Sequence, residues 1–187
     1  PLNVVLFPGG PLPLRIFETR YTDMVRQCLR EQLAFGVVLI RNGGEAGEVA
    51  KTAAIGTSAR IVDFAQLPGD LLGLSCVGER KFRVLTRWRA TDGLNRAQVQ
   101  WLGLESALPV PPEAEYLVDI LRKVLPELDA AYQHVDKRFD DAAWVGARIV
   151  ELIPLELADK QALLELNDPI ERLERLVSMI RRPAADE

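Results

Sequence analysis

The chain is poor in the side chains that carry most enzyme chemistry, because its 187 residues include one histidine and two cysteines. His134 has no serine or cysteine motif beside it, so we interpret it as a surface or helix-packing residue; a hydrolase would need a nucleophile brought to it by the fold. One histidine with two distant cysteines, Cys28 and Cys76, matches no zinc or iron ligand pattern. We therefore predict no enzyme, metal or cofactor, and two buried thiols rather than a disulfide.

Nucleotide-binding motifs and long hydrophobic runs are also missing. Lys51-Thr52 is similar to the end of a phosphate-binding loop, but Ala50 stands where that motif needs glycine. The longest apolar run, Ala34–Ile40, is far too short to cross a bilayer, and no basic segment precedes a hydrophobic signal region. These absences argue against an ATPase, a dehydrogenase and a membrane protein, and they predict a cytoplasmic location.

What the chain does have, near its start, is an apolar segment interrupted by proline and glycine. The prolines lack backbone donors and the glycines adopt angles closed to other residues, which prevents a regular element through Pro8, Gly9, Gly10 and Pro11. We expect a rigid loop there, joining a strand that ends near Phe7 to one that covers Leu12–Phe17. The chain begins with Pro1 rather than Met, so residues before it are expected to be missing from this sequence.

A helix is predicted to begin at Glu18, directly after this loop. Its apolar residues recur three and four positions apart, which places one buried stripe on Tyr21, Met24, Val25, Cys28 and Leu29. An apolar loop beside such a helix has two interpretations: it plugs the end of a barrel, or it stays exposed as an interaction surface. The residues alone leave both open.

The rest of the first half is predicted to consist of β-strands. Short runs rich in β-branched residues, separated by turn signals such as Asp92-Gly93, occur at Ala34–Arg41, Ala53–Ala65, Leu71–Val77, Lys81–Ala90 and Ala97–Leu104. Gly56 is expected to mark a bulge or tight bend. About six uneven strands with one early helix favour a partly closed β-barrel.

The second half is predicted to be helical. Helical spacing of apolar residues covers Glu115–Leu128, Ala142–Ile153, Leu157–Leu166 and a final helix that starts at Pro169. Pro126 should kink or end the first of these helices. Asp168 has the position of an N-cap, and Asp140-Asp141 is interpreted as a loop and N-cap rather than a carboxylate site.

Charge and proline content change together between the halves. Residues 1–104 carry 13 basic and 9 acidic side chains, whereas residues 105–187 carry 10 and 18. The proline-rich joint Leu108–Pro112 lies at this change. We therefore predict a β-barrel domain at 1–108 and a helical bundle domain at 109–187, an α+β class overall.

A basic strand face offers a second kind of site. Strict alternation along the strand would place four cations on one side, namely Lys81, Arg83, Arg87 and Arg89. Such a face could contact the phosphates of RNA. The chain as a whole is acidic, with a pI near 5.2, and Trp88 is expected to face away from the cations. We therefore favour a solvated outer face, and keep RNA binding as the alternative function.

The opening residues resemble the N-terminal, substrate-binding domain of Lon proteases. The resemblance is carried by Val5–Gly9, Leu12–Glu18, Arg20-Tyr21 and Met24-Val25, and it continues in Phe35–Leu39, Ile55–Thr57, Ala59–Ile61, Gly78–Val84, Leu163–Glu165, Asp168-Pro169 and Arg172-Leu173. The match spans nearly the whole chain. It implies a PUA-like pseudo-barrel followed by a helical bundle, in agreement with the two predicted halves.

The resemblance also implies a function. In Lon, this region helps to hold polypeptide substrates, whereas separate ATPase and protease domains act on them. We expect a stand-alone, non-catalytic module that binds unfolded or extended polypeptide, with an ATP-dependent protease or chaperone as a candidate partner. The residues predicted to line or shape the binding surface are Phe7, Pro8, Leu12, Phe17 and Tyr21.

Overall fold

The computed structural model describes residues 1–42, 51–69 and 71–181, and these form two compact units. The first unit comprises Pro1–Gly103 and Ala131–Val135. The second comprises Leu104–Ala130 and residues 136–181. The chain thus passes between units a few residues before the predicted joint at Leu108. The sequence Asn42-Gly43-Gly44 predicts a turn after the strand Ala34–Arg41, but its two glycines lie outside the described ranges, as do the final residues.

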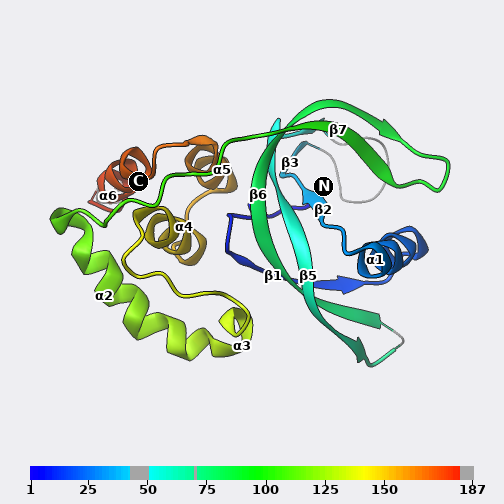
Figure 1. The fold of residues 1–187 in the computed structure, drawn as a ribbon, viewed down its shortest axis with the longest axis horizontal. Helices are drawn as coiled ribbons and strands as arrows, with labels where there is room; N and C mark the ends of the chain where they lie inside the picture. Colours follow the sequence, from blue (N-terminus) through cyan, green and yellow to red (C-terminus); the bar gives the residue numbers. More distant parts are fainter. Residues whose placement is uncertain (43–50, 70, 182–187) are drawn as a thin grey trace, which may run out of the picture. The chain divides into compact units, whose positions relative to one another are not determined.

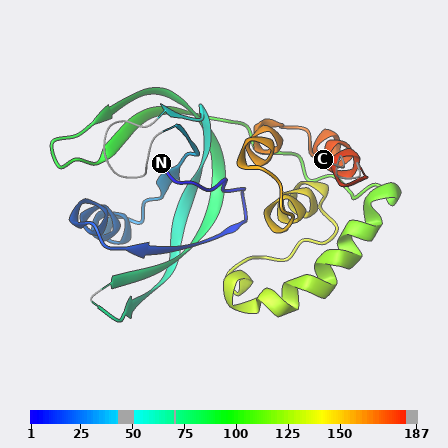
Figure 2. The ribbon, with the colours of Figure 1, turned by 180° about the vertical axis from the view of Figure 1, so that it is seen from behind.

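The first unit contains an antiparallel sheet with one helix, as Figures 1 and 2 show. Its described elements are β1 (Pro11–Ile16), α1 (Thr19–Glu31), β2 (Phe35–Val37), β3 (Ile40–Asn42), β4 (Lys51–Thr52), β5 (Ile55–Leu67), β6 (Leu71–Arg89) and β7 (Asn95–Trp101). The strand order is β1-β6-β5-β2, with β7 paired to the later part of β6. β3 and β4 form a separate pair.

The strand β6 differs most from the prediction. It runs unbroken for 19 residues, where two strands separated at Gly78 were expected. β5 follows it with bulges between Thr57 and Ala59 and between Ile61 and Asp63, rather than at Gly56. A bulge adds a residue to one strand and bends it, so the pair can curve without breaking.

The prediction of a strand that ends near Phe7 is also wrong. Residues 1–10 form no strand, and their one β-type pairing is an isolated bridge between Leu2 and Leu39. The segment is instead bound to the middle of β6. The amide of Gly9 donates to the carbonyl of Gly78 at 2.7 Å, and the amide of Gly78 donates to the carbonyl of Gly10 at 2.9 Å. Gly9 has a φ of 70°, which glycine adopts without strain.

The core of the first unit lies between the sheet and α1. Its buried residues come from the opening segment, α1 and four strands: Leu6, Leu12, Ile16, Val25, Val37, Ala59, Leu74 and Cys76. The predicted stripe of α1 is present in part. Val25 and Cys28 are buried and Tyr21 and Met24 pack against the core, whereas Leu29 is 39% exposed.

The second unit is helical. Its described elements are η1 (Pro112–Ala114), α2 (Glu115–Val124), η2 (Leu125–Leu128), α4 (Ala142–Leu152), α5 (Leu157–Glu165) and α6 (Pro169–Arg181). The short helix α3 (Asp129–Tyr132) is divided between the two units after Ala130. α2 ends before Pro126, as that residue predicts, and continues as a 3-10 turn. In the described ranges, no helix combines the length and apolar character needed to span a bilayer.

Side-chain caps and a buried ion pair organise these helices. Asp141 accepts a hydrogen bond from the amide of Ala143 at 3.0 Å, and Asp168 accepts one from Ile170 at 2.8 Å, so both predicted N-caps are confirmed. Arg172 is 1% exposed, and its Nη1 donates to Oε2 of Glu105 at 2.7 Å. Its other nitrogens donate to backbone carbonyls of the same unit, which satisfies the buried guanidinium.

The tightest backbone approach in the sheet gives a test of the fold. A Cβ at Gly56 would lie 2.2 Å from the carbonyl oxygen of Val37, so Gly56→Ala should force β5 and β2 apart. We expect a loss of about 1–3 kcal/mol in the free energy of unfolding of the β unit, measured by urea denaturation. Gly103→Ala is the control, because a Cβ there meets no atom within 4 Å. Equal stability of the two variants would contradict the packing described.

Candidate functional site

The loop predicted to bind polypeptide is mostly closed off. Phe7 is fully buried and Leu12 is 5% exposed as a member of the core, so neither side chain is available to a partner. Tyr21 packs against the core, and its ring lies 4.7 Å from the guanidinium carbon of Arg20. Of the apolar rings predicted here, only Phe17 is exposed, at 76%.

The burial of this loop has a physical cause. Its backbone occupies the space beside Gly78, where an added Cβ would lie 2.2 Å from the carbonyl oxygen of Phe7. The hydroxyl of Thr57 also donates to the carbonyl of Leu6 at 2.6 Å. A segment held to two strands in this way turns its apolar side chains inward, because its backbone hydrogen bonds are already made. The loop is held against β5 and β6, so the expectation that Phe7 and Leu12 form an exposed interaction surface is wrong.

The basic face predicted on β6 does not form either. Lys81 is 2% exposed, so its ammonium group is not offered to a polyanion. The remaining three cations are exposed but divided: Arg83 lies on one face of the strand, and Arg87 and Arg89 lie on the other.

A β-bulge at Leu85 causes this division. Val84 pairs with Val99, but after the register shift Arg87 pairs with Ala97. Paired residues share a face of the sheet, and Ala97 and Val99 share a face of β7 because they are two positions apart. Arg87 therefore joins the apolar face that strict alternation had assigned to Val84. One extra residue in a strand moves every later side chain of that strand to the opposite face of the sheet.

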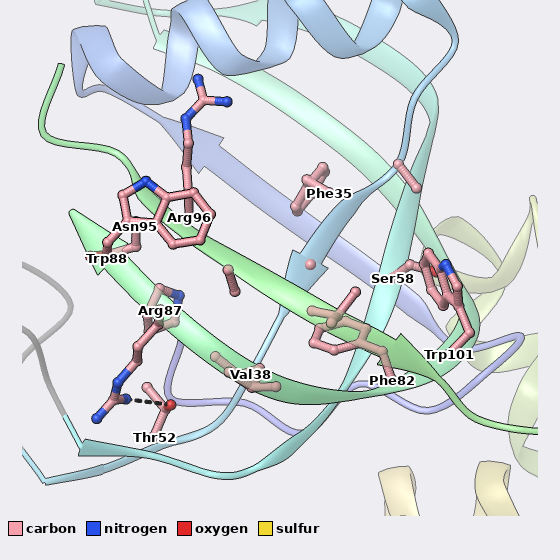
Figure 3. Close-up of a pocket in the computed structure, with 16 residues that line it drawn as sticks. Phe35, Val38, Thr52, Ser58, Phe82, Arg87, Trp88, Asn95, Arg96 and Trp101 are labelled. Carbon is pink, nitrogen blue, oxygen red and sulfur yellow. Dashed lines mark hydrogen bonds between the residues drawn. The ribbon is translucent and has the colours of Figure 1, made fainter. Parts of the chain in front are cut away.

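A groove lies between β2 and β7 and over β6 (Figure 3). Most of its lining comes from that face, whereas Trp88 and Arg96, which pair with each other one position further along, line its end from the opposite face. It encloses a cavity of about 270 Å³. We call it the β2–β7 groove and define it by six of its lining residues: Phe35, Phe82, Arg87, Trp88, Arg96 and Trp101. All of them belong to the first unit.

One end of the groove is aromatic. The ring of Phe82 is buried at its base, and Trp101 meets that ring edge to face with centroids 6.1 Å apart. Gly36 allows this packing, since a Cβ there would lie 2.9 Å from the Cζ of Phe82. Trp101 is 49% exposed, with the guanidinium carbon of Arg80 5.5 Å from its ring. The packing against Phe82 thus leaves about half of the Trp101 side chain exposed to solvent.

The other end carries cations. Trp88, also 49% exposed, lies there with Arg96, as Figure 3 shows. The Nη1 of Arg87 donates to Oγ1 of Thr52 at 2.8 Å, which fixes that side chain across the groove. Arg96 lies 3.7 Å from a carboxylate oxygen of Asp92, a long contact between exposed groups. None of the described residues that line the groove is acidic.

The groove is bordered by a strand edge. Among the described residues, β7 pairs with β6 alone, through positions from Phe82 to Arg89. A strand paired on one side presents a row of backbone donors and acceptors on the other. The groove therefore combines backbone hydrogen-bonding groups with exposed aromatic surface.

The reactive side chains lie outside this groove. Burial raises the pKa of Cys76 to about 12 and raises the pKa of Cys28 as well, so both thiols stay protonated at neutral pH. His134 Nε2 lies 3.8 Å from a carboxylate oxygen of Asp63 at a solvent-exposed position. Within the described residues, no cluster of histidine, cysteine and carboxylate side chains is arranged to hold a metal ion.

Comparison with known proteins identifies the family. Residues 1–182 match the model of the ATP-dependent protease La (LON) substrate-binding domain. The chain belongs to the Lon substrate-binding domain family. The resemblance seen in the sequence is therefore confirmed, and with it the α+β class and the PUA-like β fold.

Two relatives of this domain carry different names. A Lon protease of Anaeromyxobacter dehalogenans is 25% identical over 96% of this chain, and protein cereblon of Gallus gallus is 29% identical over 64%. The matched regions are 22% and 26% of those proteins, so this chain spans about a quarter or less of their length. A crystal structure of a Lon N-terminal domain protein from Xanthomonas campestris is 37% identical, with a TM-score of 0.77, covering 95% of this chain and 94% of that one.

The groove was missed in the sequence for a definite reason. Strict alternation predicts Phe82, Val84 and Trp88 on one side of a strand, and Val99 and Trp101 on one side of the next. The bulge at Leu85 moves Trp88 to the other side, and alternation does not tell which apolar face is covered. Here the opposite strand β2 is only three residues long and ends beside Val38, which leaves the face partly open.

The state of the thiols can be tested by labelling. With a pKa near 12 against an ordinary value of 9.0, the thiolate population of Cys76 is roughly a thousandfold lower than in an exposed thiol. We expect both cysteines to resist a chromogenic disulfide reagent at pH 8 in the native protein and to react promptly in urea. The stability linked to Cys76 should be complete below pH 9 and decline toward pH 12. Prompt labelling of the native protein would contradict this burial.

Proposed function

We propose that this Lon-family domain is a non-catalytic module that binds unfolded or extended segments of other polypeptides in the β2–β7 groove. The observation that carries the proposal is the pair of half-exposed tryptophans that line this groove, Trp88 on β6 and Trp101 on β7. Exposed aromatic surface in a concave site is typical of a binding site. The family to which the chain belongs is described as substrate-binding, which supports the same proposal.

The binding mode follows from the strand edge. An extended segment that pairs with β7 satisfies its own backbone hydrogen bonds there, whatever its sequence. Alternate side chains of that segment then point into the groove, toward Phe82 and Trp101. Such binding tolerates many segment sequences, because backbone hydrogen bonds supply part of the affinity. The groove adds a preference for apolar side chains.

The affinity should be modest. Covering the exposed half of each tryptophan removes on the order of 100 Å² from water, a gross gain of about 2–3 kcal/mol per ring. Loss of freedom on association and ordering of a flexible segment offset much of this gain. We expect dissociation constants in the micromolar range, which suits a module that releases what it binds.

The relatives also suggest what receives a bound segment. Two of the relatives are named Lon protease and match this chain over only 22% of their own length. An ATP-dependent protease or chaperone is therefore the proposed recipient. RNA is the less suited ligand, because the expected row of four cations is divided by the bulge at Leu85.

Titration with an unfolded protein tests this proposal. We would use a fluorescently labelled protein kept unfolded by reduction and neutral alkylation, and follow its anisotropy. Saturable micromolar binding is expected, and Trp88→Ala should weaken it roughly three- to tenfold by removing aromatic surface from the groove. Native circular dichroism of the variant would be confirmed first.

Phe17→Ala is the matched control. It removes an exposed ring of the same unit that lies in the originally predicted loop, and it should leave the affinity unchanged. A loss of affinity with Phe17→Ala but not with Trp88→Ala would move the site to that loop. Absence of saturable binding by the wild-type protein would refute the proposed function itself.

A further inference from the structure

The side chains of β7 alternate between two surroundings. Ala97, Val99 and Trp101 line the β2–β7 groove, whereas Gln98 and Gln100 between them do not line it and are exposed. A strand added at the edge of β7 continues this alternation, because side chains of paired residues share a face of the sheet. Every second side chain of a bound segment would therefore enter the groove, and the side chains between would stay in water beside the glutamines.

The backbone groups of β7 alternate as well. The amide of Leu102 donates to the carbonyl of Lys81 at 3.0 Å, and the carbonyl of Leu94 accepts from the amide of Ala90 at 2.9 Å. The register shift between β6 and β7 adds its extra residue to β6, so the alternation along β7 is unbroken. The even-numbered residues of β7 thus turn their backbone groups toward β6, and the odd-numbered residues turn theirs toward the open edge. These odd-numbered residues include the three whose side chains line the groove.

We propose that the groove binds a segment antiparallel to β7 and recognises every second residue of it, by a large apolar side chain together with a free backbone amide. This inference rests on the proposed function and names the class of segment bound. That class has apolar residues at positions i, i+2 and i+4, and the residues between them are polar and need no amide hydrogen.

The two requirements fall on the same residues of the segment for a geometric reason. In an antiparallel pair, residues that exchange both backbone hydrogen bonds lie directly opposite each other, and their side chains share a face. The partners of Ala97, Val99 and Trp101 would therefore make the backbone bonds and also fill the groove. In a parallel pair the bonds are slanted and go to the residues on either side, whose side chains point away from the groove.

The spacing of apolar residues separates this class from other unfolded segments. A segment patterned for an amphipathic helix has apolar residues three and four positions apart, and these fall on both faces when the segment is extended. A shift of one residue along β7 only exchanges the two faces. The cavity of about 270 Å³ has room for a few side chains. Each large side chain left outside it should cost roughly three- to tenfold in affinity.

Two labelled nonapeptides of identical composition test the selection. The first has three phenylalanines at every second position, and the second has them three and four positions apart. The first should bind roughly tenfold more tightly in fluorescence anisotropy, because all its rings share a face. Equal affinity, or failure of both peptides while the unfolded protein still binds, would overturn the selection and leave the proposed function intact. Failure of the peptides and of the unfolded protein would refute the proposed function.

Backbone methylation of the first peptide tests the pairing. N-methylation at the phenylalanines removes the donors that face β7 and should weaken binding roughly tenfold. N-methylation at the residues between them should change the affinity less than about twofold, because those amides point to solvent. Equal affinities of the two methylated peptides would overturn the edge pairing. The reverse order would indicate a parallel segment and would also overturn the proposal.

Two neighbouring variants of β7 locate the bound peptide. Ala97 and Gln98 are both exposed, and they lie on opposite faces of the strand. Ala97→Glu places a charge in the groove and should weaken binding of the first peptide roughly tenfold. Gln98→Glu adds the same charge on the other face and should leave the affinity within about twofold. An equal effect of the two variants would overturn the placement of the segment in the groove.

Discussion

The backbone pairing of β6 is the constraint on which the β unit depends. This one strand pairs with β1 near its start, with β5 over most of its length and with β7 near its end. A strand that serves three partners has to curve, and the bulges in β5 and at Leu85 provide the extra residues that allow it. The core, the closed loop and the groove all take their positions from this strand.

Two positions on β6, Gly78 and Leu85, determine which apolar surfaces of the β unit are buried and which stay exposed. At Gly78 the missing side chain lets the Phe7–Gly10 segment bind to the strand, which buries an apolar loop that would otherwise be exposed. At Leu85 the extra residue turns Arg87 toward the groove and leaves Arg83 behind. The same strand thus buries the apolar Phe7–Gly10 segment and places Arg87 at one end of the β2–β7 groove. A binding site of mixed chemistry results from two local backbone features.

The distribution of charge suits the proposed role. The groove lies in the part of the chain with an excess of basic residues, whereas residues 105–187 carry 18 acidic against 10 basic side chains. In the helical unit the charges that are fully buried serve the fold: Arg172 is satisfied by Glu105 and by backbone carbonyls, and Arg148 pairs with Glu151 at 2.7 Å. The exposed arginines Arg87 and Arg96 belong to the β unit and line the groove.

The sequence by itself determined the family, the α+β class, the helices and their caps, because these depend on local patterns. Asp141 and Asp168 cap helices through amides two residues away, and Pro126 ends α2 by its own ring. Only the tertiary structure decided which apolar residues are exposed. Phe7 and Trp101 are both large and apolar, yet one is fully buried and the other half-exposed. That difference depends on which backbone segment covers each face and on a one-residue bulge, and neither leaves a periodic signal in the chain.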